Sequence, residues 1–457
     1  MEEPAPPLRE VSLDEAMSIA ILFQQHGQLA EAEGVYRKIL ELVPDHADAL
    51  HFSGVLAHQQ GRSQEGIGLI QRSLAIEPGR ADCYSNLGIM FKAQQRLDEA
   101  VAAYQQAIAL EPAHWNAHNN LGVLFKAQGR LDEAEAAYRE AIRLNPEYAD
   151  AYHNLGILLG NRGRTREAVA CYCKVTTLSP RHPEARRLLA MAHCTLGEDD
   201  KAVAIFEEWL REEPDNVVAQ HMLAACSGRS VPERASDAYV EKVFDEFANS
   251  FDAKLAKLSY QAPQVVAAML ADAGLEPNGS LDVLDAGCGT GLCGPLVRPY
   301  ARRLTGVDLS GKMLDRAREK QAYDTLVKGE LTAYLSAHPG EFDVVISADT
   351  LVYFGALDEV IAAAAAALKP GGVLVFTVED EAGDAEGVDY RICTHGRYGH
   401  ARGYIEGVLA AAGLRTHIVK VELRMEAGAP VAGFAVRAAR PVADELTAVA
   451  RTGVAHG

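Results

Sequence analysis

The first half of the chain repeats one pattern of small, aromatic and proline positions every 34 residues. In one unit the apolar positions fall on one face of each of two short helices, namely Leu87, Gly88 and Phe91, then Ala100, Tyr104, Ala107 and Ile108. A proline ends each unit, at positions 44, 78, 112, 146, 180 and 214. One unit cannot bury its apolar face alone, so the pattern predicts six stacked helix–turn–helix units over about residues 11–214.

This Leu-Gly, aromatic, alanine, aromatic and proline spacing resembles the tetratricopeptide repeat. The resemblance implies an α solenoid capped by a further helix over residues 215–228, with a concave surface that binds a protein or peptide. Asn86, Asn120 and Asn154 recur before Leu-Gly and would face this groove. An amide donates and accepts hydrogen bonds, so a ladder of amides suits an extended peptide backbone. The alternative is that these side chains are solvated or connect neighbouring helices.

In the second half, short apolar runs alternate with helical patterns. The runs predict strands over residues 281–286, 303–308, 324–328, 342–348, 373–378, 417–423 and 431–436, and helices over 291–300, 310–320, 357–368 and 402–412. This alternation predicts an α/β domain with a largely parallel sheet covered on both faces. Ligands of such sheets bind beyond the carboxyl ends of the strands.

Residues 239–258 carry phenylalanine and leucine at helical spacing. They predict a helix that leads into the α/β domain and either covers its site or only docks against it. The chain is therefore expected to comprise a tail (1–10), a solenoid (11–228), a linker with a lid or docking helix (229–262), an α/β domain (263–440) and a second tail (441–457).

Charge and composition exclude several classes of protein. There are 44 basic and 63 acidic residues, and the resulting net charge of −19 opposes a broad contact with nucleic acid. The sequence contains no segment apolar enough for a bilayer and no secretion signal, and eight cysteines are too few for a disulfide scaffold. We therefore expect a cytoplasmic protein with neither a nucleic-acid nor a membrane partner.

A glycine-rich turn follows the first predicted strand, in the segment VLDAGCGTG over residues 283–291. Alternate glycines let a ligand lie against bare backbone, and the following helix offers free N–H groups. Asp308 ends the second strand, where a carboxylate can accept hydrogen bonds from both hydroxyls of a ribose. Residues 289–294 also fit the dinucleotide pattern G-x-G-x-x-G, but that register leaves Asp285 and Gly287 unexplained.

The D-x-G-x-G-x-G turn, the DLSGKML segment at 308–314 and the LKPGG turn at 368–372 resemble class I S-adenosylmethionine-dependent methyltransferases. Together with the repeats, they resemble a group of bacterial methyltransferases that carry tetratricopeptide repeats. The resemblance implies a seven-stranded Rossmann-like domain with S-adenosylmethionine as cofactor. It implies cofactor contacts from Asp285, Gly287, Cys288, Gly289, Gly291, Asp308, Leu309, Met313, Glu330 and Leu331.

Methyl transfer requires mainly that the acceptor be held against the methyl group in a dry cleft, and a general base only if the acceptor arrives protonated. Asp349, Tyr353 and His400 are the candidates for residues near the reacting atoms, with ordinary capping or packing roles as the alternative. Arg397 and Tyr404 are candidates for contact with the acceptor. We expect no metal site.

The leading hypothesis is a methyltransferase that acts on a protein or peptide recruited by the repeats. A small-molecule methyltransferase whose repeats serve assembly is the alternative. A third hypothesis, a repeat scaffold with an inactive methyltransferase domain, is opposed by the intact glycine turn and by Asp308.

Overall fold

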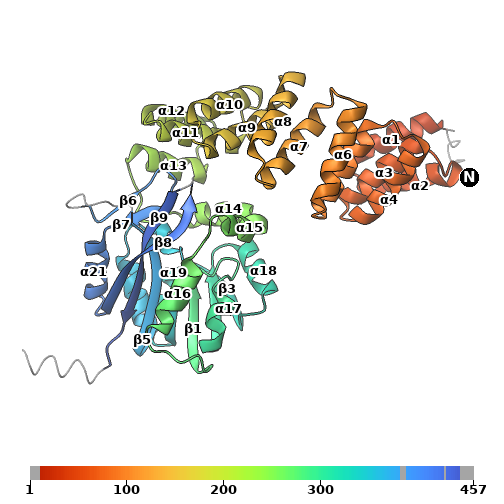
Figure 1. Cartoon of the computed structure of the whole chain (residues 1–457). Coiled ribbons are helices and arrows are strands. Elements are labelled where there is room, and N and C mark those ends of the chain that lie inside the picture. Colours follow the sequence, from red (N-terminus) through yellow and green to blue (C-terminus); the bar gives the residue numbers. More distant parts are fainter. Residues whose placement is uncertain (1–10, 381–387, 427–428, 443–457) are drawn as a thin grey trace, which may run out of the picture. The chain divides into compact units, whose positions relative to one another are not determined.

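The computed structural model describes residues 11–380, 388–426 and 429–442 (Figure 1). The expected tail at 1–10 lies outside these ranges. So does the expected tail at 441–457, apart from its first two residues. The chain folds as two compact units, residues 1–185 and 186–457. None of the helices in the described ranges combines the length and the apolar character needed to cross a membrane.

Five antiparallel helix pairs make up the first unit. Their bounds are α1 Leu13–Gln25, α2 Leu29–Leu42, α3 Ala47–Gln59, α4 Ser63–Ile76, α5 Ala81–Ala93, α6 Leu97–Leu110, α7 Trp115–Ala127, α8 Leu131–Leu144, α9 Ala149–Asn161 and α10 Thr165–Leu178. Each turn and helix falls where the 34-residue period predicts it, so the solenoid prediction is confirmed.

A contact between a glycine and a tyrosine explains how closely the two helices of a repeat approach each other. A Cβ atom added to Gly88 would lie 2.6 Å from the ring of Tyr104, and one added to Gly122 would lie 2.8 Å from that of Tyr138. Both tyrosines are fully buried. The Leu-Gly and aromatic positions of the repeat are therefore one packing contact, in which the ring lies directly on bare backbone.

The second unit begins with a sixth helix pair and a further helix of the same kind, followed by the α/β domain. Its helices are α11 Pro183–Thr195 (which starts just before the boundary), α12 Asp199–Glu212, α13 Val217–Ser227, α14 Asp237–Phe247, α15 Phe251–Lys257, α16 Ala262–Ala271, α17 Gly294–Val297, α18 Gly311–Glu319, α19 Leu331–Ala337, α20 Asp358–Ala367 and α21 Arg402–Ala411. Short 3-10 turns lie at Ala248–Ser250 (η1), Arg298–Tyr300 (η2) and Leu351–Tyr353 (η3).

One mixed sheet forms the centre of this unit. Its nine strands within the described residues are β1 Leu281–Ala286, β2 Ala301–Asp308, β3 Thr325–Lys328, β4 Phe342–Ser347, β5 Leu368–Glu379, β6 Tyr390–Ile392, β7 Tyr398–His400, β8 Arg415–Glu426 and β9 Ala429–Ala439. Strands β3-β2-β1-β4-β5 run parallel, and β9 joins β5 antiparallel with β8 beyond it. These seven strands make the predicted Rossmann-like sheet, and the hairpin β6–β7 extends it at the end of β5.

Apolar clusters cover both faces of this sheet. One includes Leu284, Val345 and Phe376 with helices α20 and α21. The other includes Val283, Val344 and Val375 with helix α16. Adjacent residues of one strand therefore enter opposite clusters, which explains why the buried strands read as continuous apolar runs.

Three local expectations differ from the structure. The helix predicted over 291–300 begins only at Gly294, because Gly287, Gly289 and Gly291 all have positive φ angles that a helix cannot contain. The helix predicted over 239–258 is broken by η1 into α14 and α15. Helix α19 and the hairpin β6–β7 were not expected.

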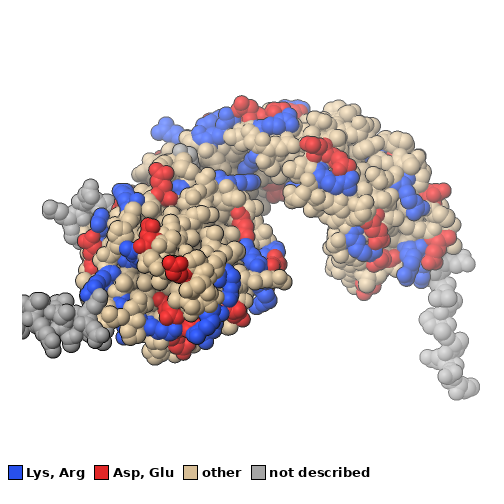
Figure 2. All heavy atoms as spheres, turned by 60° about the horizontal axis from the view of Figure 1, so that its bottom comes forward, with Lys and Arg blue, Asp and Glu red and all other residues tan. Residues whose placement is uncertain are grey.

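On the face shown in Figure 2, acidic and basic side chains are interspersed.

Candidate functional site

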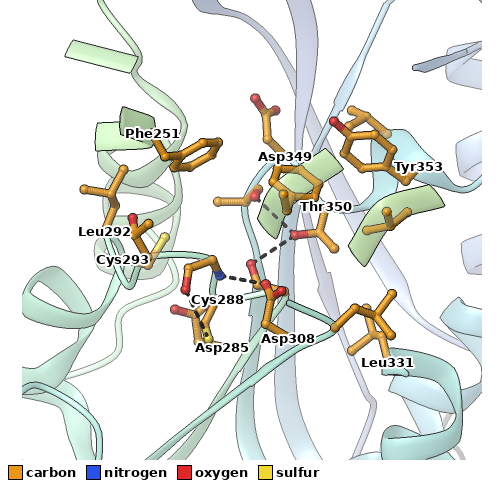
Figure 3. A pocket seen from close by; sticks show the side chains of 18 of the residues that line it. Phe251, Asp285, Cys288, Leu292, Cys293, Asp308, Leu331, Asp349, Thr350 and Tyr353 are labelled. Atoms are coloured by element: carbon orange, nitrogen blue, oxygen red, sulfur yellow. Dashed lines mark hydrogen bonds between the residues drawn. The ribbon is translucent and has the colours of Figure 1, made fainter. Parts of the chain in front are cut away.

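A cavity of about 240 Å³ lies at the carboxyl ends of β1, β2 and β4. Its walls come from the glycine turn after β1, the ends of β2 and β4, the start of α19, and helices α14 and α15. In Figure 3, Asp285 and Asp308 lie on one side of this space, and Phe251 and Asp349 on the opposite side. The position agrees with the rule that α/β sheets bind ligands beyond the carboxyl ends of their strands.

Most of the predicted site residues line this cavity. They are Asp285, Gly287, Cys288, Gly289, Asp308, Leu309, Glu330, Leu331, Asp349, Tyr353 and Arg397. Among the predicted residues of this unit, Gly291, Met313, His400 and Tyr404 do not line it. Met313 is fully buried beneath the site, and Glu330 also caps α19, since its carboxylate accepts hydrogen bonds from the backbone N–H groups of Thr332 and Ala333.

The first two glycines of the turn have different environments. Gly287 has φ +80°, and an added Cβ would lie 2.1 Å from Oγ1 of Thr350, whose hydroxyl donates to the Gly287 carbonyl at 3.1 Å. Gly289 has φ +51°, and an added Cβ would meet nothing within 4 Å. The turn is therefore packed tightly against the β4 end at Gly287 and presents bare backbone beside open space at Gly289.

Asp308 joins the glycine turn to the start of α18. Its Oδ2 accepts a 2.8 Å hydrogen bond from the Gly289 N–H, and its Oδ1 accepts one of 2.8 Å from the Ser310 N–H. Burial raises the pKa of this carboxyl, and the backbone N–H groups of Ser310, Gly289 and Leu309 oppose that rise. Each oxygen keeps further acceptor capacity at the cavity, which suits a ligand with neighbouring hydroxyls.

Asp285 is the most buried carboxylate of the cavity, with 1% of its surface exposed. Burial raises its pKa to about 7, although a hydrogen bond from the Tyr323 hydroxyl stabilises the charged form. Tyr323 follows α18 and was not anticipated as a site residue. Its ring also lies where a Cβ of Gly291 or Gly294 would be, so it supports the turn from behind.

Asp349 has a left-handed backbone conformation, with φ +53°, that residues other than glycine rarely adopt. Its Oδ2 accepts a 2.7 Å hydrogen bond from Nη1 of Arg424, and its N–H donates to the Thr377 hydroxyl at 2.9 Å. Burial raises the pKa of the Asp349 carboxyl, against the effect of Arg424. Strain of this kind persists where surrounding contacts enforce it, and it concentrates at functional sites.

Arg424 and Arg397 form a buried network with acidic residues behind Asp349. Arg424 also binds Glu379 and Glu426, and Arg397 binds Glu379 at 2.6 Å and both oxygens of Glu426 at 2.9 Å. Both arginines line the cavity, and Glu379 is fully buried. The sequence pattern indicated Arg397, but Arg424 lies in an ordinary strand and was missed.

Two predicted residues have structural contacts elsewhere. His400 is fully buried, and its Nε2 lies 2.9 Å and 3.1 Å from the carbonyl oxygens of Phe354 and Gly355, so its N–H donates to them. Burial lowers its pKa to about 4. The Tyr404 hydroxyl donates to Asp358 and accepts from the Leu357 N–H. Because neither side chain reaches the cavity, we assign neither a role at the reacting atoms.

Helices α14 and α15 cover the cavity with an apolar face, and their polar side chains attach them to neighbouring elements. Phe244, Phe251 and Leu255 line the cavity. Polar side chains on the same segment bind the elements that carry the glycine turn and α18, through the pairs Glu241–Lys328, Asp245–Ser310, Asn249–Arg316, Asp252–Thr290 and Asp252–Lys320. The segment is therefore attached to the glycine turn itself, to α18 and its ends, and to the end of β3.

In the first unit, the amides expected to face a peptide are partly engaged between repeats. Nδ2 of Asn86 donates to Nε2 of His51 at 2.8 Å, and Nδ2 of Asn154 donates to Oδ1 of Asn119 at 3.0 Å. These contacts match the alternative interpretation of polar residues that connect neighbouring helices. Each of the two side chains keeps its carbonyl oxygen as an acceptor, and Asn120 is partly buried.

Comparison with known proteins identifies the class of both units. Residues 283–372 match a family model described as a methyltransferase domain, and residues 17–81, 86–149, 137–170 and 161–226 match models of the tetratricopeptide repeat. The chain therefore combines tetratricopeptide repeats with a class I methyltransferase domain.

Among the described residues, no group of three His, Cys, Asp or Glu side chains is placed to hold a metal ion.

Individual relatives match the methyltransferase domain only in part. The chain is 39% identical over 101 residues to the ubiquinone biosynthesis O-methyltransferase of Thiobacillus denitrificans, which is 21% of this chain and 43% of that protein. It is 38% identical over 95 residues to the malonyl-[acyl-carrier protein] O-methyltransferase of Enterobacter lignolyticus, which is 21% of this chain and 38% of that protein. The chain thus spans about two fifths of the length of these relatives. A solved structure of Pseudomonas aeruginosa pilF covers 46% of this chain and 96% of its own, at 20% identity and a TM-score of 0.42.

Proposed function

We propose that the second unit is an S-adenosylmethionine-dependent methyltransferase. The observation that carries this proposal is Asp308, whose two oxygens are fixed by the Gly289 and Ser310 N–H groups while the carboxylate still faces the cavity. A carboxylate so placed at the end of the second strand suits the two hydroxyls of a ribose. The family model for residues 283–372 supports the same conclusion.

The residues of the cavity fit the parts of this cofactor. Asp308 would accept hydrogen bonds from the ribose hydroxyls, and Leu309 and Leu331 would lie against the flat base. Gly287 and Gly289 would pass beneath the methionine part, with Asp285 near its ammonium group. The cofactor would supply an electrophilic methyl group on a sulfonium. The apolar cover from α14 and α15 would keep water out of the cavity.

On the opposite side, Asp349, Tyr353 and Arg397 are the residues that we propose to meet the acceptor. All three line the cavity, and Asp349 combines a left-handed backbone conformation with a hydrogen bond from Arg424. Burial raises the pKa of Asp349, which suits a group that takes a proton from an acceptor arriving with one. Its other role would be to orient the acceptor by a hydrogen bond.

The proposed acceptor is a protein or peptide that the repeats recruit. Support comes from the repeats themselves, because stacked helix pairs form extended concave binding surfaces. The second candidate is a small-molecule acceptor, with the repeats serving assembly. It is favoured by the names of the two relatives, both O-methyltransferases, one named for ubiquinone biosynthesis and one for an acyl-carrier protein.

Methylation of a lysate from the host separates these acceptors. The full chain is incubated with tritium-labelled S-adenosylmethionine, and label is counted in the protein and small-molecule fractions. A variant that lacks residues 1–185 is the matched partner, since the cut follows the boundary between the two units and keeps the contact of α13 with the α/β domain. Recruitment predicts labelled protein that is lost in the truncated variant while cofactor binding is retained.

The substitution Asp308→Ala in the full chain is the control for background labelling. Label in small molecules from both the full and the truncated chain would favour the second candidate. Label in neither fraction, although the full chain binds the cofactor, would contradict the proposed activity.

A further inference from the structure

Two cysteine side chains from different helices meet in the second unit, outside its α/β domain. Cys194 lies near the end of α11 and Cys226 near the end of α13, 32 positions apart in the sequence. Their sulfur atoms are 3.0 Å apart in an S–H···S hydrogen bond. This is closer than two non-bonded sulfur atoms normally approach, and a disulfide requires a further approach of only about 1 Å.

The surroundings give the two thiols different properties. Cys226 is 9% exposed and packs in an apolar cluster with Phe206, Trp209 and Met222, whereas Cys194 is partly exposed at the edge of that cluster. The contact between the two sulfur atoms lowers the pKa of the Cys194 thiol, and the same contact together with burial raises the pKa of Cys226. Cys194 is therefore the more accessible thiol and the one that ionises more readily, and Cys226 is the protected one beside it.

We propose that Cys194 and Cys226 are an oxidative modification site, which closes to an intramolecular disulfide when the chain meets a peroxide. The Cys194 thiolate attacks one peroxide oxygen, the O–O bond breaks, and the thiol becomes a sulfenic acid with release of water after proton uptake. Cys226 then attacks the Cys194 sulfur, the S–S bond forms and a second water leaves. Two thiols are thereby oxidised by two electrons, and one hydrogen peroxide is reduced to two waters.

The cross-link would fix a helix that touches two walls of the cavity. His221, five residues before Cys226 on α13, donates from Nε2 to the Gly396 carbonyl at 2.8 Å, next to Arg397. Its ring also stacks on Tyr239 of α14, with centroids 3.9 Å apart. A disulfide would tie the end of α13 to α11 and restrict these contacts, so hydrogen exchange should slow in residues 217–227 after oxidation.

Peptide mapping of the full-length protein tests the proposal. The purified chain is treated with hydrogen peroxide, remaining thiols are alkylated, and tryptic peptides are analysed without reduction. The expected product joins the peptides over residues 188–201 and 212–229, is two hydrogens lighter than their sum, and disappears after reduction. The number of free thiols should fall from eight to six.

Three variants make the result decisive. Cys194→Ser and Cys226→Ala should each abolish the joined peptide, whereas Cys173→Ser, which removes an exposed cysteine on α10, should leave it intact. Alanine is chosen at position 226 because a small apolar side chain suits the apolar cluster around it, so that the variant should still fold. The proposal is overturned if peroxide converts Cys194 to sulfinic acid, or links it to other cysteines, without forming the 194–226 bond in the unmodified sequence.

Discussion

The Tyr323 hydroxyl donates a 2.6 Å hydrogen bond to Oδ2 of Asp285, from a position 38 residues further along the chain. The contact places a neutral donor against the most buried carboxylate of the cavity. It connects the segment after α18 to the end of β1, beneath the glycine turn. The protonation state of Asp285 therefore depends on a residue that no local motif indicates.

The first prediction concerns the pH dependence of cofactor binding. Because burial raises the pKa of Asp285 to about 7, its charged fraction increases as the pH rises from 6 to 8. If the carboxylate meets the cofactor ammonium, affinity for S-adenosylmethionine should increase by up to about tenfold over this range. Tyr323→Phe removes a bond that favours the charged form, so the midpoint should move to higher pH. Isothermal titration calorimetry at several pH values measures both effects.

Asp285→Asn is the control for this pH profile. It should bind weakly and without the rise between pH 6 and 8, so that any remaining slope belongs to the amine of the ligand. A flat profile for the unmodified chain would show that Asp285 does not meet a cation.

The second prediction concerns Asp308. Asp308→Ala removes the acceptor proposed for the ribose and also the partner of the Gly289 and Ser310 N–H groups. Hydrogen bonds to charged groups contribute about 1.5–3 kcal/mol each, so affinity for S-adenosylmethionine should fall at least about tenfold. Asp315→Ala, which removes an exposed acid of α18, is the matched control and should bind normally. Equal affinity of the two variants would refute the ribose contact.

The architecture could be predicted from the sequence because its signals are local or periodic. The glycine and tyrosine that recur every 34 residues are those that pack together within each repeat, as Gly88 and Tyr104 do. The alternate glycines after residue 286 likewise mark positions with positive φ angles. The segment from Gly287 to Gly291 was nevertheless expected to lead into a helix at once. The same glycines that open the turn delay that helix to Gly294.

The remaining parts of the site depend on long-range register, which single residues do not reveal. Arg424 lies one residue beyond the strand predicted over 417–423. Its side chain nevertheless reaches Asp349, because β8 continues to Glu426 and pairs with β9, which lies beside β5. His400 lies in a polar segment of the sequence, which made it a candidate near the reacting atoms. In the structure it is buried in the core, where its N–H donates to two backbone carbonyl oxygens. Whether a polar side chain serves the cavity or the core was therefore decided by tertiary contacts.

The third prediction concerns the cover formed by α14 and α15. Asp252 accepts hydrogen bonds from Thr290 of the glycine turn and, at 2.7 Å, from Lys320. Asp252→Ala should loosen the cover and raise the dissociation rate of S-adenosylmethionine. The pair with Lys320 is partly exposed, so we expect a loss of about 1 kcal/mol, or about a fivefold faster dissociation. Surface plasmon resonance on the immobilised protein gives this rate.

Glu246→Ala is the control for the cover, because Glu246 is an exposed acidic residue on α14, the other helix of the cover. It should leave the dissociation rate unchanged. If Asp252→Ala also dissociates at the normal rate, the cover does not retain the cofactor and serves only to dock α14 against the sheet.

The last prediction concerns Arg424, whose side chain is 5% exposed and binds Asp349, Glu379 and Glu426. Arg424→Met would leave buried carboxylates without their cation, which typically costs about 3–5 kcal/mol of unfolding free energy. Arg424→Lys keeps the charge but not the planar fork, so its loss should be smaller. Urea unfolding followed by Trp209 fluorescence in a Trp115→Phe background reports the second unit alone.

Arg402→Met is the matched comparison for this loss, because Arg402 pairs with Glu406 on the exposed face of α21. Removal of such a pair should change the unfolding free energy by less than about 0.5 kcal/mol. Similar small losses for Arg402→Met and Arg424→Met would mean that water reaches the carboxylates behind Asp349. The strained backbone of Asp349 would then need another source of support, and Thr377, whose hydroxyl accepts from the Asp349 N–H, would be the next residue to replace.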